Sequence, residues 1–209
     1  MKKFELTTNT KMFLGKKLFQ IKALISFGDV EVGELGGYIE KEENLDYDGD
    51  AWVYGNARVY GNARVSGNAR VSGNACVSGD ACVYGNAWVS GNACVSGDAC
   101  VSGNARVSGD ACVYGDACVS GNACVYGNAR VSGNACYTTI KGFGREYRTT
   151  TFFKCKDGKV RVRCGCFYGD LKKFRAIVKE THGESKKAKE YLMIADLMEL
   201  HFEENENDK

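Results

Sequence analysis

The sequence predicts a mainly β protein whose centre is a single-stranded parallel β-helix of about five coils. Valine occupies every sixth position from Val53 to Val131, fourteen times without interruption, in the unit Ala-x-Val-[Ser/Tyr]-Gly-[Asn/Asp]. Ala and Val are two positions apart, so in an extended strand both point to the same face. The Gly-Asn or Gly-Asp pair that follows tolerates the left-handed backbone angles of a corner. A short strand and a corner, repeated, predict a coil that stacks on itself.

Both the hexads and the segment before them resemble known repeat proteins. Small residues two positions before an aliphatic one, as in Ala69-Arg70-Val71, resemble the hexapeptide repeat of left-handed β-helices, in which three hexads form a coil of eighteen residues. The lead-in Gly28-Asp29-Val30 and Leu35-Gly36-Gly37-Tyr38-Ile39-Glu40 resembles the N-terminal cap of the YdcK-like family of bacterial and phage hexapeptide-repeat proteins. This resemblance covers residues 17 to about 137 and implies left-handed coils. The family's transferase label rests on fold analogy, which does not establish function.

A coil of eighteen residues predicts which outward residues stack on one another. The residue before each Val falls into three rows: Trp52, Arg70, Trp88, Arg106 and Cys124; Arg58, Cys76, Cys94, Cys112 and Arg130; Arg64, Cys82, Cys100, Cys118 and Cys136. Trp and Arg alternating about 4.8 Å apart can stack by cation–π contact or offer a platform to a base or sugar. Arg, Cys and Trp also interconvert by single-base changes, so drift in a duplicated tract explains the same variation.

The cysteines are interpreted as free thiols, without a disulfide framework, a metal or a cofactor. There are 11, an odd number, and eight of them recur at one repeat position. Rows of thiols could bind a soft metal or oxidise, but parallel rows lack the convergent geometry of a metal site. The remaining three, Cys155, Cys164 and Cys166, are expected to be core thiols. No apolar run or leader segment is present, so we expect a cytoplasmic protein that does not cross a membrane.

The segments on either side of the repeat predict two end modules. Residues 1–44 form an N-terminal β cap, with strands at Phe4–Leu6 and Lys17–Leu24, and residues 45–140 form the β-helix. Residues 141–189 carry 15 Lys and Arg against 5 Asp and Glu, and residues 141–202 are predicted to form a basic ββαα module. In it, Asp157-Gly158 joins two strands, Gly169-Asp170 caps a helix that ends near Gly183, and Ser185 caps a second helix to about Phe202. Residues 203–209 are an acidic tail expected to be disordered.

One face of the predicted hairpin carries a cluster of cations. Lys154, Lys156, Lys159, Arg161 and Arg163 surround Phe152 there. A basic strand surface with an aromatic residue is suited to nucleic acid or a phosphorylated ligand, but it is equally typical of a solvated face. The candidate ligand-binding residues are therefore Trp52, Arg70, Trp88 and Arg106 in the first row and Lys154, Lys156, Arg161 and Arg163 in the hairpin.

The residues that such folds use for catalysis are scarce in this chain. Acyltransferases with this repeat typically use a histidine beside the coil, and zinc-dependent carbonic anhydrases need three, whereas the two histidines here, His182 and His201, follow the repeat. We therefore expect a non-enzymatic scaffold that presents its end modules for protein contacts. We also expect the chain to form a homo-oligomer, either a dimer or a trimer. Two alternatives remain open: a phage anti-defence protein that binds a host complex or sequesters a nucleotide or other anion, and an acyltransferase-like enzyme.

Overall fold

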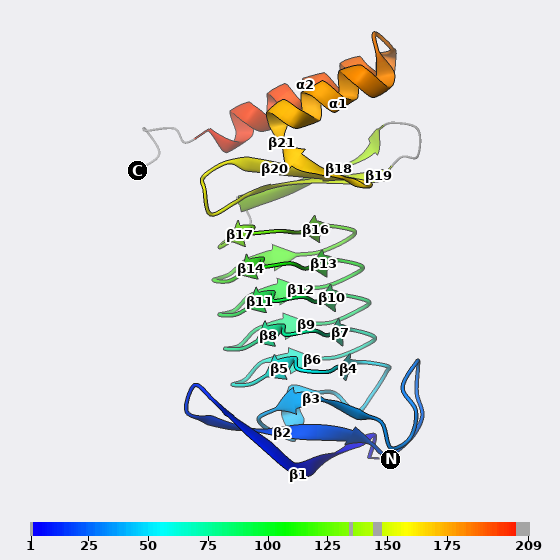
Figure 1. The fold of residues 1–209 in the computed structure, drawn as a ribbon, viewed down its shortest axis with the longest axis vertical. Helices are drawn as coiled ribbons and strands as arrows, with labels where there is room; N and C mark the ends of the chain where they lie inside the picture. Colours follow the sequence, from blue (N-terminus) through cyan, green and yellow to red (C-terminus); the bar gives the residue numbers. More distant parts are fainter. Residues whose placement is uncertain (1, 134–135, 144–147, 204–209) are drawn as a thin grey trace.

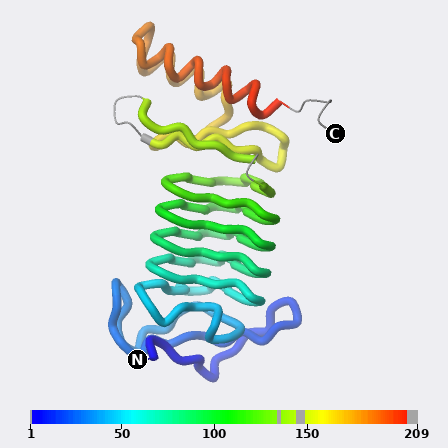
Figure 2. The backbone as a smooth tube through the Cα atoms, turned by 180° about the vertical axis from the view of Figure 1, so that it is seen from behind, coloured from blue at the N-terminus to red at the C-terminus, as the bar shows by residue number. Residues whose placement is uncertain are grey.

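The computed structural model describes residues 2–133, 136–143 and 148–203 and arranges them as a column. An N-terminal cap of strands closes one end of a solenoid. At the other end lie a four-stranded sheet and, beyond it, two helices (Figures 1 and 2). The order of modules along the chain is therefore also their order along the axis.

The solenoid consists of two-residue strands that each pair in parallel with the strand eighteen residues later. Their bounds are β4 Trp52–Val53, β5 Arg58–Val59, β6 Arg64–Val65, β7 Arg70–Val71, β8 Cys76–Val77, β9 Cys82–Val83, β10 Trp88–Val89, β11 Cys94–Val95, β12 Cys100–Val101, β13 Arg106–Val107, β14 Cys112–Val113, β15 Cys118–Val119, β16 Cys124–Val125 and β17 Arg130–Val131. They form three faces, ordered β16-β13-β10-β7-β4, β5-β8-β11-β14-β17 and β15-β12-β9-β6. The predicted rows are confirmed, except that Cys136 lies outside the third sheet. Left-handedness stays a prediction.

The interior of the solenoid is apolar on every coil. The repeat Ala and Val residues from Ala51 to Val131 are almost completely buried. Successive coils are joined by backbone hydrogen bonds, such as Cys94 N to Ala111 O and Ser96 N to Val113 O, both 2.9 Å. Buried apolar surface and a complete hydrogen-bond ladder therefore stabilise each coil in the same way.

Glycine forms the corners, where the backbone takes a left-handed conformation. From Gly55 to Gly127 the corner glycines have φ between +58° and +74°. An Asn or Asp follows each corner glycine, and several of these side chains bond to their counterparts one coil later. On one corner four asparagines form an amide ladder. In it, Asn68 donates to Asn86, Asn86 to Asn104, and Asn104 to Asn122, at 3.1, 3.2 and 3.2 Å.

The N-terminal cap extends one face of the solenoid. Its strands are β1 (Phe4–Phe13), β2 (Lys16–Ala23) and β3 (Leu35–Ile39), antiparallel to one another, and β3 pairs in parallel with β5. The predicted first strand, Phe4–Leu6, was too short, because the polar stretch after Leu6 also pairs with β2. The cap thus covers the open strand edge that the first coil would otherwise present.

The first coil begins two residues earlier than the hexad phase suggested. A short 3-10 helix η1 (Glu42–Asn44) leads to Leu45, which is buried and bridges Val65, whereas the phase of the repeat placed Tyr47 there. Tyr47 instead stacks on Phe4, with ring centroids 4.9 Å apart. The buried Asn44 amide explains the shift, since its Nδ2 donates to the carbonyl oxygens of Gly61 and Ala63 and so fixes the chain before Leu45.

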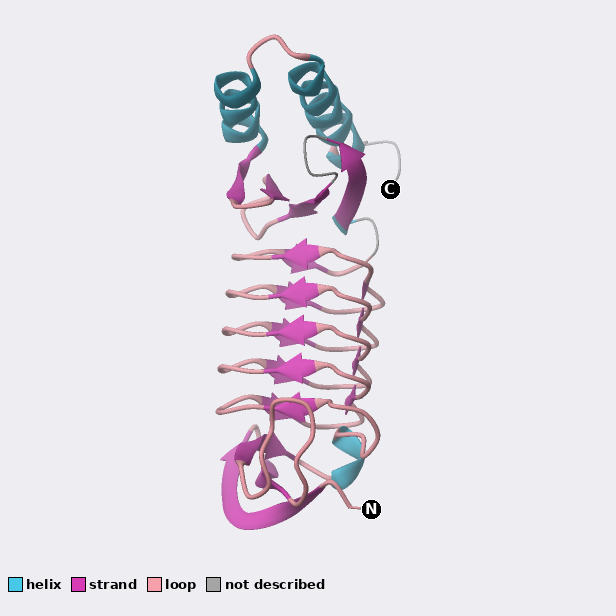
Figure 3. Ribbon diagram, turned by 90° about the vertical axis from the view of Figure 1, so that its right-hand side faces the viewer, coloured by secondary structure: helices cyan, strands magenta, loops and turns pink. Residues whose placement is uncertain are grey.

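After the solenoid, the chain forms an antiparallel sheet ordered β18-β19-β20-β21. The strands are β18 (Tyr137–Phe143), β19 (Arg148–Lys154), β20 (Val160–Cys164) and β21 (Phe167–Asp170). The sequence predicted a hairpin of two strands, Thr150–Lys156 and Lys159–Phe167. The second of them joined β20 to the start of β21, which a turn at Gly165-Cys166 separates. One face of the sheet lies on the end of the solenoid and the other carries the helices (Figure 3).

The predicted turn at Asp157-Gly158, with two loop residues, would pair Cys155 with Val160, and this register was wrong by one residue. Lys154 pairs with Val160 instead, because the loop has three residues, Lys156 to Gly158, closed by a hydrogen bond from Cys155 N to Lys159 O. A shift of one residue moves side chains to the opposite face of a sheet. Phe153 therefore packs on the solenoid core, while Phe152 packs under the helices.

Both predicted helices and their caps are confirmed. α1 (Leu171–His182) begins after Asp170, whose carboxylate accepts from Lys173 N, and ends before Gly183; α2 (Lys186–Phe202) begins after Ser185. The two helices and the upper face of the sheet enclose a second core that includes Phe174. Glu203 is the C-cap of α2, and the rest of the predicted acidic tail lies outside the described residues. None of the described helices is long and apolar enough to cross a membrane.

Candidate functional site

Trp52 is not part of an exposed platform, contrary to the prediction. Its side chain is fully buried, at 0% exposure, beneath the N-terminal cap. Phe27 and Phe4 pack edge-on against its ring, with centroids 5.4 and 6.3 Å away. Trp52 is therefore a core residue that anchors the cap on the first coil.

The rest of the first row lies on the surface and forms what we call the tryptophan–arginine strip: Arg70, Trp88 and Arg106. Trp88 is 42% exposed, and its indole Nε1 donates to Ser72 Oγ at 3.1 Å, which fixes the ring on the surface. The guanidinium carbon of Arg106 lies 5.7 Å from the Trp88 ring centroid, a cation–π contact. Arg70 is paired with Asp29 of the cap at 2.5 Å. Among the residues that the structure describes, Arg70 is thus the cation of the strip with a carboxylate partner.

The predicted basic face of the hairpin does not exist as one surface. Arg161 and Arg163 are on the solenoid side of the sheet, and Phe152 and Lys154 are on the helix side. Arg161 is ion-paired with Asp157 at 2.6 Å. Lys156 is exposed in the hairpin loop. The corrected register therefore leaves Arg163 as the hairpin cation available to a ligand beside the solenoid.

Arg163 and Arg106 meet at the junction between the solenoid and the sheet. They line a hollow of about 480 Å³ together with Lys141, Thr149, Asn104 and Asn122, here named the junction hollow. Arg106 lies on β13, Lys141 on β18, Thr149 on β19 and Arg163 on β20, so the hollow depends on both the solenoid and the sheet. Arg163 is positioned by a hydrogen bond to Cys166 O at 3.3 Å and by the Tyr126 ring, 5.5 Å from its guanidinium carbon.

The charge of the junction hollow is uniformly positive among the residues described there. Arg106, Lys141 and Arg163 carry three positive charges, and none of the described lining residues has a carboxylate. The asparagine amides and the threonine hydroxyl add neutral hydrogen-bond donors. This set of groups can bind an anion by charge-assisted hydrogen bonds.

The tryptophan–arginine strip is continuous with this hollow. A second depression, of about 540 Å³, runs along the strip, and Asn104 and Arg106 line both. Asp50 lines the end of the strip nearest the cap. The surface therefore changes along the axis, from carboxylate-containing at the cap to fully cationic at the junction.

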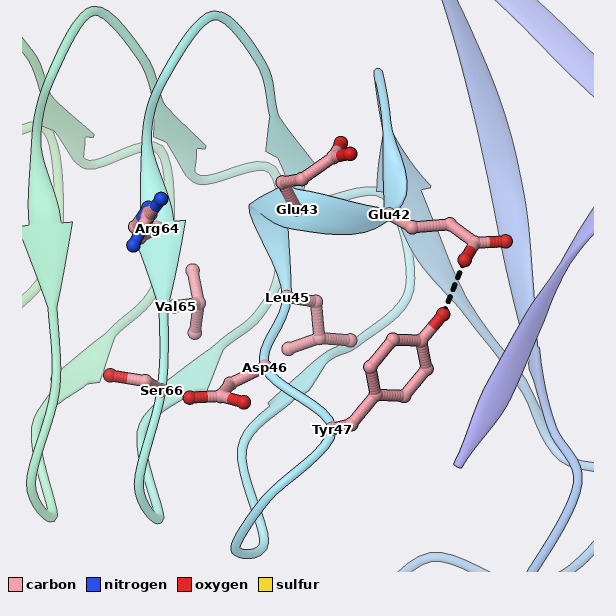
Figure 4. Close-up of a pocket in the computed structure, with 8 residues that line it drawn as sticks. All are labelled: Glu42, Glu43, Leu45, Asp46, Tyr47, Arg64, Val65 and Ser66. Atoms are coloured by element: carbon pink, nitrogen blue, oxygen red, sulfur yellow. Dashed lines mark hydrogen bonds between the residues drawn. The ribbon is translucent and has the colours of Figure 1, made fainter. Parts of the chain in front are cut away.

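A hollow at the other end of the solenoid has the opposite character. It measures about 390 Å³ and is lined by Glu42, Glu43 and Asp46 with Arg64 and apolar Leu45 (Figure 4). The carboxylate of Glu42 accepts hydrogen bonds from Tyr47 and from Lys2, and these lower the pKa of Glu42. Three carboxylates against one arginine make this hollow unsuited to an anion.

The cysteine rows are confirmed as stacks of side chains on neighbouring coils. Cys76, Cys94 and Cys112 pair in register, and Arg130 Nη1 donates to Cys112 Sγ at 2.6 Å. The hydrogen bond from Cys94 lowers the pKa of Cys76. The described residues contain no group of three or more metal-ligating side chains. Cys155 is buried on the solenoid side of the sheet, as expected of a core thiol, whereas Cys166 is exposed.

Lys141, Thr149 and the asparagines of the junction hollow escaped the sequence reasoning. Lys141 belongs to β18, a strand that was missed because its Thr-Thr-Ile-Lys-Gly stretch lacks apolar alternation. The asparagines repeat on every coil, so nothing in the sequence distinguishes Asn104 or Asn122 from the others. The sequence did show two separate groups of cations, one in the first row and one in the hairpin, but nothing in it indicated that the two groups lie side by side.

Comparison with known proteins identifies the repeat. The family model described as YdcK Beta solenoid repeat matches residues 51–67, 63–79 and 99–115. No curated protein matches the chain. The matched segments all fall within the fourteen hexads, which the structure folds into stacked coils with five strands on one face. The central body of this chain is therefore a β-solenoid, and segments of it match the YdcK beta solenoid repeat.

Proposed function

We propose that this protein is a non-catalytic binding protein, in which the solenoid is a rigid scaffold that holds the C-terminal module and binds an anion at the junction hollow. The solenoid supports a scaffold role because its interior is uniform and its backbone hydrogen bonds continue from coil to coil. The two histidines lie on α1 and α2, away from the lining of the hollow, so they supply no base there.

The observation that carries the proposal is the convergence of Arg106, Lys141 and Arg163. The solenoid and the sheet bring these three like charges to one hollow, where they repel one another. A bound anion relieves the repulsion and accepts hydrogen bonds from guanidinium groups, whose planar fork suits phosphate and carboxylate. A phosphorylated ligand fits this chemistry best.

Binding of inorganic pyrophosphate, measured by isothermal titration calorimetry, tests the proposal. A hydrogen bond to a charged group contributes about 1.5–3 kcal/mol, so Arg106→Ala is expected to weaken binding about 10- to 100-fold. Lys141→Ala should weaken it as well, and raised salt should weaken it in the parent protein. Arg64→Ala is the matched control, because Arg64 is exposed and occupies the same repeat position on another face. Absence of pyrophosphate binding, or equal loss in the Arg64 variant, would refute the proposal.

The expected homo-oligomer is supported by a different surface, the outer face of α2. Met193, Leu197 and Leu200 are 71%, 55% and 67% exposed and lie one helical turn apart. Lys186, Lys187 and Lys189 lie at the start of α2, and Asp196 and Glu199 in its second half are ion-paired with Arg175 of α1. An antiparallel pair of α2 helices from two copies would bury the apolar stripe.

Light scattering at micromolar concentration tests this second proposal. The parent protein is expected to have the mass of a dimer, and Leu197→Asp that of a monomer, because a carboxylate would be buried in the apolar contact. The control is Met12→Asp, since Met12 is 67% exposed on β1 of the cap, far from α2. A monomeric parent protein contradicts the α2 pairing but leaves anion binding unaffected.

A further inference from the structure

Building on the proposed function, we propose that the anion is a free nucleotide, with its base stacked on Trp88 and its phosphates in the junction hollow. Trp88 and Arg106 are in-register neighbours on β10 and β13, so one coil spacing of about 4.8 Å separates a stacking surface from the first cation. The order of groups along the axis, aromatic and then cationic, matches the order of base, sugar and phosphate in a nucleotide.

Trp88 has the orientation and exposure that stacking requires. Its indole Nε1 donates to Ser72 Oγ, which fixes the ring, and 42% of the residue is exposed to solvent. The Arg106 guanidinium carbon lies 5.7 Å from the ring centroid, so a base would stack on the part of the ring that Arg106 leaves exposed. An indole fixed in this way loses little conformational freedom when a base stacks on it. Bases of any kind can stack on such a ring.

The groups between Trp88 and the hollow suit a sugar or a base edge. Asn86 and Asn104 line the depression beside Trp88, and their amides belong to the amide ladder. Each side-chain amide has two N–H groups and two oxygen lone pairs, so it can bond to its neighbour and still bond to a ligand. Their positions are fixed from coil to coil by the same ladder.

The two ends of the strip favour a free nucleotide over a nucleic-acid strand. Beyond Trp88 toward the cap, Arg70 is already paired with Asp29, and Asp50 lines the depression. A phosphate backbone that continued past Trp88 would meet these carboxylates, which would repel it. Phosphate groups are therefore accommodated on only one side of the aromatic ring.

Titration of the full-length protein with pyrophosphate, adenosine 5′-diphosphate and a short oligothymidylate tests the inference. The chain has two tryptophans, and Trp52 is fully buried, so quenching of fluorescence by an added base reports on Trp88. Adenosine 5′-diphosphate is expected to bind about tenfold more tightly than pyrophosphate and to quench the fluorescence of Trp88. Trp88→Ala should reduce its affinity to that of pyrophosphate, and Trp88→Phe should retain part of the difference.

The outcomes separate this inference from the proposed function. If pyrophosphate binds and the nucleotide binds no more tightly and without quenching, the nucleotide assignment is wrong while anion binding stands. If neither binds, both are wrong. Tighter binding of the oligothymidylate than of the nucleotide would overturn the choice of a free nucleotide. Thermal melting of both Trp88 variants verifies folding, and the Trp88→Phe result remains interpretable should the alanine variant be unstable.

Discussion

The corner glycines have two separable roles, and substituting three of them with alanine measures each role. Gly91 and Gly121 both lie in the local sequence Ser-Gly-Asn, with φ of +69° and +66°. A Cβ at Gly91 would lie 2.9 Å from the backbone nitrogen of Gly109 on the next coil, whereas a Cβ at Gly121 would have no described atom within 4 Å. Gly55, at the opposite end, is equally unobstructed, with φ of +58°.

The expected cost differs because, of these three corners, only at Gly91 would the new Cβ meet the described backbone of a neighbouring coil. A left-handed backbone costs an alanine about 1–2 kcal/mol, and this is the expected loss in Gly121→Ala and Gly55→Ala. Gly91→Ala must also displace a backbone that is hydrogen-bonded on both sides, and overpacking of this kind costs about 1–3 kcal/mol. Its total expected loss is therefore about 2–5 kcal/mol.

Urea unfolding of the full chain, followed by circular dichroism and by tryptophan fluorescence, measures these losses. Two probes are needed because repeat arrays can unfold in parts, and both tryptophans lie in the first three coils. Gly91→Ala should have the lowest midpoint by both probes, with the two control variants close to each other. Equal destabilisation of all three variants would show that stacking of the corners contributes nothing, and the argument from the close approach would fail.

Three further predictions concern the end modules. Asn44→Ala removes an amide that bonds to four backbone groups, two before the 3-10 helix and two in the first coil, and is expected to cost about 2–3 kcal/mol in urea unfolding. Asn92→Ala, on the exposed corner, should cost under about 1 kcal/mol. The Glu40 carboxylate accepts hydrogen bonds from Lys16 Nζ and from Gly61 N–H, and these lower the pKa of Glu40. Its contribution to the free energy of unfolding is therefore present above its ordinary pKa of 4.5 and is lost as the pH falls through the folded-state value. Glu40→Gln should be less stable at pH 7 and should lose less stability between pH 5 and 3. Asp170→Ala removes the N-cap of α1 and should lower stability by about 0.5–2 kcal/mol, measured by thermal melting, with Asp170→Asn largely restoring it.

The solenoid was predictable because its sequence determines each coil locally. Every Val and Ala has the same surroundings, so a single rule about alternation and corners applies along the whole body, and the predicted pairing of Trp88 with Arg106 is confirmed. Trp52 obeys the same rule for its backbone but not for its side chain. Its ring is covered by Phe4 and Phe27, which are distant in sequence, so no local pattern predicts that contact.

The junction was less predictable because two loop lengths fit the same sequence. Asp157-Gly158 is compatible with a two-residue turn, but the observed loop also contains Lys156, and this choice decides the face on which every hairpin residue lies. In the observed register both apolar faces of the sheet are buried, since Phe153 packs on the solenoid and Phe152 packs under the helices. Only knowledge of both packing partners distinguishes the two registers, and it also determines that Arg163 meets Arg106.

The amide ladder has a direction, which gives the solenoid a polarity along its axis. Each amide from Asn68 to Asn104 donates its N–H to the oxygen of the next coil, so the side-chain dipoles point the same way. Hydrogen bonds in such a chain polarise one another, and the chain ends at the amide that accepts from Asn104. That final amide is Asn122, which lines the junction hollow. The repeated corner asparagines therefore deliver a partial positive charge to the end of the column where the fixed cations gather, much as aligned peptide groups do at the start of a helix.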